Sequence, residues 1–233
     1  MKISIFSLPE LNPGKCSIKD SRLDQVDNIT KAKKKTYVQV ELVGENLALE
    51  SDAILVSSDA KTDLILKDLE FVETRLSRCE GEKEKGILNK LKSVLEKEEL
   101  IFKAELTLEE KETISGYSLF TSRPVIVADK AGLEDTNALL VKALSESGYI
   151  SFFTTGEKET RAWLIKKGAT AWEAAGVIHS DIQRGFIRAE IISFADFISA
   201  GGETQAKQAG KMRLEQKDYV MQDTDLANFR FNK

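Results

Sequence analysis

The sequence contains little of several residue types on which common functional sites depend. Its 233 residues include one histidine, two cysteines and three prolines. Cys16 and Cys79 lack C-x-x-C spacing and metal-site neighbours, so we interpret both as reduced thiols. No nucleophile or second ligand is apparent near His179, which disfavours a catalytic or metal role for the imidazole. We expect His179 to make structural hydrogen bonds near the end of a helix.

Long apolar runs are also absent. No stretch approaches the 18 or so residues that a membrane span needs, and the apolar start is too short for a signal peptide. The formal charge of −4 gives the whole chain no attraction for nucleic acid, so such binding would need a local basic face. With 42% hydrophobic and 31% charged residues, we expect a cytoplasmic globular protein with more than one core.

The first part of the chain has β-like periodicity. Short apolar runs occur at Ile3–Phe6, Tyr37–Val43 and Ala53–Val56, and a later run at Pro124–Ala128 precedes a helical pattern over residues 135–144. Buried strands interleaved with helices predict an α/β sheet. This sheet is interrupted by a long segment before Pro124.

The interruption has helical periodicity. Apolar residues recur at spacings of three and four along two segments, which are Ile65, Leu69, Val72 and Leu76 in the first and Leu88, Leu91 and Leu95 in the second. A charged loop flanked by glycines separates them. The pattern predicts an antiparallel helical hairpin of coiled-coil type over about residues 61–103. We interpret its charges as solvated helix surface, with a role in oligomerisation as the alternative.

From Tyr149 the pattern returns to strands. Runs at residues 150–154 and 160–165 flank a turn and predict a hairpin. Thr170–Glu173 has the spacing of a helix-capping box. Further strands are expected at residues 186–192, 219–221 and 228–231. A hairpin, a helix across it and returning strands follow one another in the order of a β-grasp fold.

Several motifs of this last region resemble the TGS domain of the YchF-type P-loop ATPases/GTPases, an Obg-related family. They are Phe152–Gly168, Ala174–Asp181, Arg184–Glu190, Ala200–Glu203, Tyr219–Asp225 and Phe229–Asn232. Upstream, Asp20–Asp24, Lys31–Lys35 and Ser51–Val56 are similar to pieces of the family's nucleotide-binding domain. The resemblance predicts a shortened P-loop-NTPase-like domain over residues 1–148, with the hairpin as its coiled-coil insertion, and a TGS-like β-grasp domain over residues 149–233.

The sequence lacks the phosphate-loop motif that this resemblance implies. That loop requires G-x-x-x-x-G-K-[ST], but Pro9 stands five residues before Gly14, and Cys16 follows Lys15. Residues 1–9 resemble the family's first strand and the start of its loop, whereas residues 10–24 resemble a segment well downstream. We therefore expect the phosphate loop, first helix and first switch to be deleted between Pro9 and Glu10.

Two further nucleotide motifs are altered. The family's D-x-x-G appears as Glu41-Leu-Val-Gly44, and its base-reading N-x-x-E appears as Asp129-Lys-Ala-Gly132. Gly44, Asp129 and Lys130 are the candidate remnants of a nucleotide site, although Asp129 and Lys130 also suit a polar strand-to-helix turn. Phosphoryl transfer depends on positioned phosphate and metal ligands, so we expect no catalysis, no bound metal and no cofactor. The alternative is a residual switch that binds ATP or GTP with Mg²⁺ and hydrolyses it weakly or not at all.

A candidate partner-binding face lies in the last region. It consists of Lys166, Lys167, Trp172, Arg184 and Arg188. Such cations suit a phosphate backbone, and a tryptophan can line a core or groove or stack on a base. The family resemblance implies a ribosome, a translation-related RNA or a protein partner. The sequence thus favours a non-enzymatic binding protein with no membrane partner, and it leaves the oligomeric state open.

Overall fold

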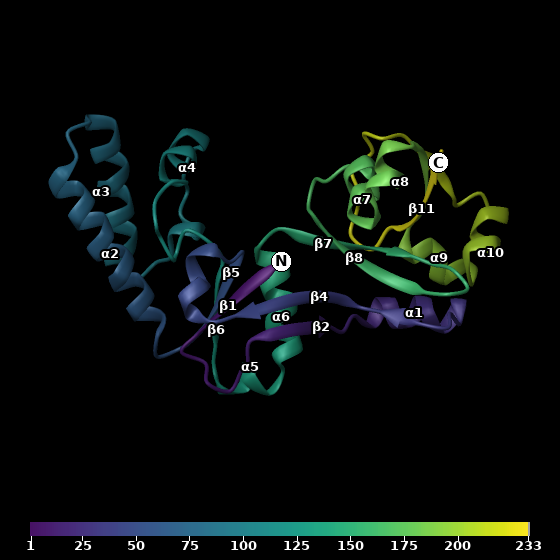
Figure 1. The fold of residues 1–233 in the computed structure, drawn as a ribbon, viewed down its shortest axis with the longest axis horizontal. Helices are drawn as coiled ribbons and strands as arrows, with labels where there is room; N and C mark the ends of the chain where they lie inside the picture. The colour runs from purple at the N-terminus through teal and green to yellow at the C-terminus, as the bar shows by residue number, and fades with distance from the viewer. Residues whose placement is uncertain (233) are drawn as a thin grey trace. The chain divides into compact units, whose positions relative to one another are not determined.

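The computed structural model describes residues 1–232, without the side chains of residues 130 and 131. The chain folds into two units (Figure 1). The parallel-sheet unit comprises Met1–Cys16 and Val40–Ser147, and the mixed-sheet unit comprises Ser17–Gln39 and Gly148–Lys233. The segment Ser17–Gln39 therefore belongs with the carboxyl-terminal residues, whereas the sequence placed it in the amino-terminal domain.

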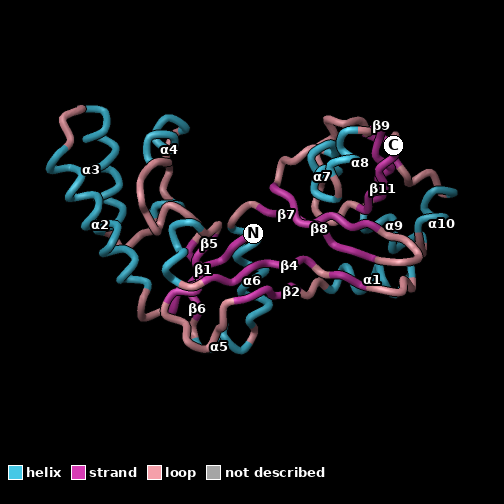
Figure 2. The backbone as a smooth tube through the Cα atoms, viewed as in Figure 1, coloured by secondary structure: helices cyan, strands magenta, loops and turns pink. Residues whose placement is uncertain are grey.

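The parallel-sheet unit is built on a sheet with the strand order β2-β4-β1-β5-β6 (Figure 2). Its elements are β1 (Lys2–Phe6), β2 (Gly14–Ile18), β4 (Val38–Val43), η1 (Glu45–Glu50), β5 (Ala53–Ser57), α2 (Lys61–Arg78), α3 (Glu82–Glu96), η2 (Ile101–Lys103), α4 (Leu108–Ile114), β6 (Val125–Ala128), α5 (Lys130–Glu134) and α6 (Thr136–Glu146). Strands β2 and β4 each extend by two residues past the boundaries of this unit. Strand β1 pairs in parallel with β4 and β5, and β6 pairs in parallel with β5. The predicted parallel α/β sheet is confirmed. Strand β2 was not predicted, because the proline and glycine at its start indicated only a turn.

Two helices, α2 and α3, occupy the interruption and lie side by side (Figure 1). The apolar residues of the two predicted stripes pack together here. Leu64, Ile65 and Val72 of α2 and Leu88, Leu91 and Leu95 of α3 are all buried in one cluster. Burial of such side chains stabilises a fold by about 1.5–3 kcal/mol each. The stripes thus form the core of the hairpin.

A buried carboxylate ties α2 to the segment that leads into β6. Asp68 accepts hydrogen bonds from the backbone N–H groups of Phe120 and Thr121 and from Thr121 Oγ1, each at 2.7 Å. Burial raises the pKa of Asp68, and these hydrogen bonds oppose the rise. The bonds fix the end of the insertion so that β6 can pair with β5.

The mixed-sheet unit has the strand order β10-β9-β11-β7-β8-β3. Its elements are α1 (Ser21–Thr30), β3 (Lys35–Thr36), β7 (Tyr149–Thr154), β8 (Thr160–Lys166), α7 (Ala171–Ile178), α8 (Ser180–Arg184), β9 (Phe186–Ile192), α9 (Phe194–Ala200), α10 (Glu203–Gln208), β10 (Arg213–Glu215) and β11 (Leu226–Phe231). Strands β7 and β8 form the predicted antiparallel hairpin. Strand β11 pairs in parallel with β7 and antiparallel with β9.

One face of this sheet packs against α7. Phe152, Ile165, Ala189 and Ile191 of the strands share a buried cluster with three alanines of the helix. The small alanine side chains allow α7 to lie close to the strands. The helix begins with the predicted capping box, in which the Thr170 hydroxyl accepts from the Glu173 N–H and the Glu173 carboxylate accepts from the Thr170 N–H.

The opposite face of the same sheet is covered by α1. This helix contacts β8 and α9, and its residues Leu23 and Val26 are fully buried. Thr30 Oγ1 lies 2.7 Å from Thr160 Oγ1, at the start of β8. Gly202, with a φ of +137°, follows α9, and a Cβ at this position would lie 3.4 Å from Ile29 of α1. In Figure 1, β7 and β8 run between α7 and α1.

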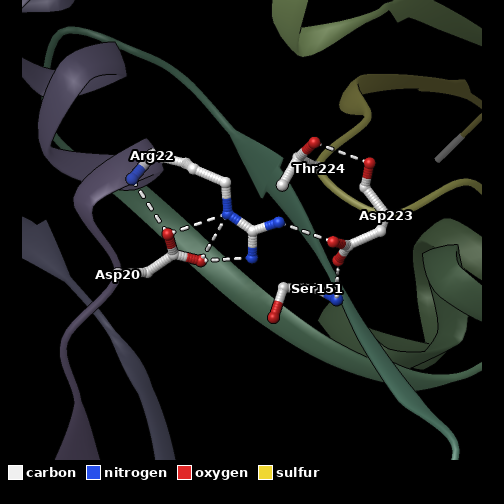
Figure 3. Close-up of polar contacts among 5 residues, drawn as sticks. All are labelled: Asp20, Arg22, Ser151, Asp223 and Thr224. Carbon is white, nitrogen blue, oxygen red and sulfur yellow. Dashed lines mark hydrogen bonds and ion pairs between the residues drawn. The ribbon is translucent and has the colours of Figure 1, made fainter. Parts of the chain in front are cut away.

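A polar network at the start of α1 holds the helix to the loop before β11 (Figure 3). Asp20 caps α1 by accepting a hydrogen bond from the backbone N–H of Arg22. The Arg22 guanidinium donates to Asp20 at 2.8 Å and to Asp223 at 2.6 Å. Asp223 also accepts from the backbone N–H of Ser151 at 3.0 Å. These contacts and the buried face of α1 explain why Ser17–Gln39 folds with the carboxyl-terminal residues.

The predicted strand at residues 219–221 is wrong. Only an isolated bridge between Thr170 and Val220 forms there. The buried carboxylate of Asp225 instead accepts from the Tyr219 hydroxyl and from the Gln222 backbone N–H, both at 2.9 Å. These bonds hold the segment in a turn, which prevents a continuous ladder.

Candidate functional site

The first candidate site lies at the carboxyl edge of the parallel sheet, where ligands of open α/β folds bind. A hollow of about 420 Å³ occurs at this edge, beside the end of β1. Its lining residues are Phe6, Ser7, Glu45, Asp63, Leu66, Lys67 and Glu70. The lining therefore contains three carboxylates and one ammonium group.

The ammonium group is directed at aromatic rings. Lys67 Nζ lies 4.7 Å from the centroid of the Phe6 ring and 5.6 Å from that of Phe120. Each distance is within the range of a cation–π contact. A nucleotide phosphate here would face Glu45, Asp63 and Glu70, with one partly engaged lysine to balance them. The charge of the hollow does not fit a nucleoside triphosphate.

The connection after β1 does not have the geometry of a phosphate loop. Residues 7–13 join β1 directly to β2 and contain no helix. Leu8 is buried and anchors the connection in the core, and Pro9 has no backbone N–H to offer. A phosphate loop needs successive N–H groups followed by the N-terminus of a helix. The described residues between β1 and β2 provide neither feature.

Two of the three candidate remnants, Gly44 and Asp129, have hydrogen-bond partners within the parallel-sheet unit. The carbonyl of Gly44 accepts a hydrogen bond from Ser4 Oγ at 3.3 Å. The carboxylate of Asp129 caps α5 by accepting from the Gly132 N–H at 2.7 Å. Gly44 and Asp129 follow β4 and β6, which are separated by β1 and β5, or roughly 14 Å of sheet. The side chain of Lys130 lies outside the described residues.

The second candidate site is the surface around α7. Trp172 lies in the first turn of α7 with 45% of its surface exposed. Its backbone N–H donates to the Lys217 carbonyl at 3.2 Å. Lys167, which follows β8, is exposed. Lys166 Nζ lies 3.7 Å from the centroid of the Tyr149 ring. The exposed tryptophan thus lies beside the backbone of one lysine.

The two predicted arginines lie on different faces of the mixed sheet. Arg184 ends α8 and pairs with Asp181. Arg188 lies opposite Arg230 in the register of β9 and β11. Because Ala189 faces α7, strand alternation directs Arg188 to the other face. The five residues predicted as one partner-binding face are therefore divided between two surfaces.

The structure also contains an apolar hollow that the sequence did not reveal. It has a volume of about 940 Å³ and is lined by Ile178, His179, Asp181, Ile182, Arg184, Gly185, Phe231 and Asn232. His179 Nδ1 accepts from the Asp181 N–H at 3.1 Å and so caps α8, which is a structural role. The hollow depends on α8 meeting the end of β11, a contact between distant segments that no local pattern marks.

The part of the chain that the structure describes contains neither a metal-ligand cluster nor a helix able to span a membrane. No group of three histidine, cysteine, aspartate or glutamate side chains there is arranged to hold a metal ion. None of the helices in that part is both long and apolar enough to cross a bilayer.

Comparison with known proteins decides the family. Residues 149–232 match the family model YchF-GTPase_C, described as a protein of unknown function (DUF933). The chain is also 35% identical over 235 residues to the ribosome-binding ATPase YchF of Bacillus subtilis, across 73% of this chain and 64% of that protein. The chain belongs to the YchF family. Over 82 residues it is 60% identical to the ribosome-binding ATPase YchF of Escherichia coli O157:H7, which is 35% of this chain and 23% of that protein.

The YchF fold extends beyond the matched carboxyl-terminal region. The YchF GTPase structure from Schizosaccharomyces pombe aligns with a TM-score of 0.78 at 20% identity, over 99% of this chain and 97% of that chain. The chain nevertheless spans only 64% of the Bacillus subtilis YchF. The alignment with the Bacillus subtilis protein is 235 positions long. It includes 73% of the 233 residues of this chain, which is about 170 residues. The chain is thus shorter than this YchF relative inside the aligned region.

Proposed function

We propose that this YchF-family chain is a binding protein that recognises a ribosome or RNA through its mixed-sheet unit and does not hydrolyse nucleotides. The curated relatives are named ribosome-binding ATPases. The proposal transfers ribosome binding to this chain and leaves the ATPase activity out. Binding would then be constitutive, because no nucleotide would switch it on or off.

The observation that carries the proposal is the direct connection between β1 and β2. Residues 7–13 leave no room for the phosphate loop and its helix, and three carboxylates line the hollow beside them. Catalysis of phosphoryl transfer consists almost entirely of positioning and electrostatic stabilisation. Without a phosphate cradle the parallel sheet would serve as a scaffold, whereas residues 149–232 keep the family's pattern.

The topology of the mixed-sheet unit supports its interpretation as a TGS-type β-grasp module. A hairpin, the helix α7 across one face, and β11 inserted in parallel beside β7 are the features of that arrangement. The surface of Trp172, Lys167 and Arg184 is the proposed contact site on the α7 side. The exposed Trp172 can stack on a base, and cations of the same unit would meet phosphates.

Co-sedimentation with purified ribosomal particles tests the binding. We expect the wild-type chain to pellet with the particles at low salt, and Trp172→Ala to weaken this binding at least tenfold because Trp172 would be a central contact. Leu108→Ala is the matched control, since Leu108 is an exposed apolar residue of the other unit. A wild-type chain that stays in the supernatant and binds no RNA would overturn the proposal.

Calorimetric titration with ATP and GTP in the presence of Mg²⁺ tests the absence of a nucleotide switch. We expect no saturable heat and no thermal stabilisation at millimolar nucleotide, because a bound ligand would raise the stability of the folded state. Saturable heat accompanied by a rise in Tm would instead favour the alternative, a residual nucleotide-binding switch.

A further inference from the structure

Two distant segments build a lysine-rich edge on the mixed-sheet unit. The Lys33 N–H donates to the Glu157 carbonyl at 3.1 Å, and the Thr160 N–H donates to the Lys34 carbonyl at 2.9 Å. Strand β3 continues this contact by pairing in parallel with β8. The loop of residues 31–35 therefore lies along the turn between β7 and β8. The lysine edge is defined here as Lys31 and Lys33 of the loop with Lys158 of the turn.

The carboxylates near the lysine edge are largely engaged by other groups. Glu159 lies 3.3 Å from Lys34 Nζ and 3.9 Å from Arg161 Nη1, and it also accepts from the Thr36 hydroxyl. These contacts hold the pKa of Glu159 below its usual range, the Thr36 bond having the largest effect.

A second acidic pair, Asp24 and Asp27, is also engaged. Asp24 lies 2.7 Å from Lys35 Nζ and Asp27 lies 4.0 Å from it. The lysine edge itself is exposed, and its three ammonium groups have no ion-pair partner among the described residues. The exposed Glu157 carboxylate is the remaining negative group on the turn, so the edge keeps an excess of positive charge.

A flat cation lies next to this edge. The Arg161 guanidinium carbon is 3.9 Å from the centroid of the Trp163 ring. Trp163 is fixed in turn by a hydrogen bond from Nε1 to Thr154 Oγ1 at 2.9 Å and by parallel packing against Phe152. The guanidinium plane is thus held against a rigid ring, with 38% of the Arg161 side chain exposed. Unstacked RNA bases stack on such arginine planes.

We propose that the lysine edge binds the phosphate backbone of single-stranded RNA, with Arg161 as a platform for one base. This assignment rests on the proposed function and names a site separate from the surface around Trp172. Single-stranded RNA fits because stacking on Arg161 requires a base that is free of its helix, whereas a duplex offers only its backbone. The site joins residues that lie more than a hundred positions apart in the sequence.

Fluorescence anisotropy with the full chain and a short labelled oligouridine tests this proposal. We expect the variant Lys31→Gln/Lys33→Gln/Lys158→Gln to bind at least tenfold more weakly at low salt. The slope of log affinity against log salt should fall by roughly 2, because each phosphate contact on a single strand contributes about 0.7. The matched control is Lys19→Gln/Lys207→Gln/Lys211→Gln, which removes the same charge from exposed lysines of the same unit.

The control separates a local site from general attraction. Equal weakening by the two triple variants, or no weakening by the first, would overturn the assignment. Arg161→Lys keeps the charge but removes the plane, so it should weaken binding several-fold with an unchanged salt slope. An unchanged affinity would overturn the stacking role, and equal affinity for a duplex of the same length would overturn the preference for single strands. Near-native circular dichroism of each variant is required as a folding check.

The outcome is distinguishable from failure of the proposed function. If the wild-type chain pellets with ribosomes and the lysine-edge variant does so equally well, this assignment fails while the proposed function stands. If the wild-type chain binds neither ribosomes nor oligouridine, the proposed function itself fails.

Discussion

Arg22 and Asp223 lie 201 positions apart in the sequence, yet the guanidinium of one donates a 2.6 Å hydrogen bond to the carboxylate of the other (Figure 3). The same guanidinium contacts Asp20, the residue that caps α1. These hydrogen bonds, led by that to Asp20, raise the pKa of Arg22 above its ordinary value. The pair therefore links the start of α1 to the loop before β11.

Replacing Arg22 by methionine tests this link. Arg22→Met keeps most of the aliphatic length but leaves Asp20 and Asp223 without their shared cation. The Arg22 side chain is 40% exposed, so solvent screening limits the expected loss to about 1 kcal/mol in the free energy of unfolding. Urea denaturation measures it. Arg184→Met, which removes a local and more exposed ion pair, is the control and should change stability less.

Leu23 tests whether α1 is part of the mixed-sheet core. Both tryptophans, Trp163 and Trp172, lie in this unit, so intrinsic fluorescence reports its unfolding. Leu23→Ala should destabilise the fluorescence-detected transition by about 2–5 kcal/mol, because Leu23 is fully buried. Leu88→Ala removes an equally buried leucine from the parallel-sheet unit and should leave that transition nearly unchanged. Equal effects of the two variants would contradict the division of the core.

The lowered pKa of Glu84 leads us to expect that the stability of the α2–α3 hairpin depends on pH. Hydrogen bonds from Tyr117, Arg75 and Cys79 lower the pKa of Glu84 to about 2. A lowered carboxylate pKa stabilises the folded state above the unfolded value of 4.5, and this contribution disappears as the pH falls toward about 2. The stability difference between wild type and Glu84→Gln, measured by thermal circular dichroism, should therefore shrink over that interval. Glu82→Gln, which changes a highly exposed carboxylate, should show no such trend.

The hydrogen bond between Tyr117 and Glu84 also leads us to expect a loss of stability at high pH. Burial, aided by the hydrogen bond to Glu84, raises the pKa of Tyr117 to about 12. The protonated phenol is favoured in the folded state, so its contribution is complete below about pH 10 and is lost as the pH rises to about 12. Ultraviolet titration of tyrosinate should lose one high-pH component in Tyr117→Phe. Loss of a component near pH 10, with the high-pH components unchanged, would show that Tyr117 titrates normally.

Local patterns predicted the elements whose burial follows a regular period. A segment of about ten residues is enough to predict each of these elements. They are the strands β1, β4, β5 and β6, the two leucine stripes and the capping box of Thr170. The turn at Tyr219 was predicted wrongly because its apolar residues resemble a strand. The hydrogen bonds of Asp225 that prevent a ladder come from the folded loop.

The absence of a phosphate-loop motif could be seen in the sequence, whereas the binding surfaces could be recognised only in the structure. A phosphate loop is contiguous in sequence, so its absence is visible there. Arg188 was grouped with Arg184, and only the strand register separates the two onto opposite faces. The lysine edge was not recognised, because its lysines belong to segments that meet only through pairing of β3 with β8.

The sequence by itself determined the parallel sheet, the helical insertion and the family pattern of residues 149–232, and it contains no phosphate-loop motif. Each of these is encoded by short-range periodicity or by a contiguous motif. Only the tertiary structure decided that Ser17–Gln39 belongs with the carboxyl-terminal residues. The apolar residues of α1 specify that one helix face must be buried, but the partner of that face is chosen by long-range packing and by the link from Arg22 to Asp223.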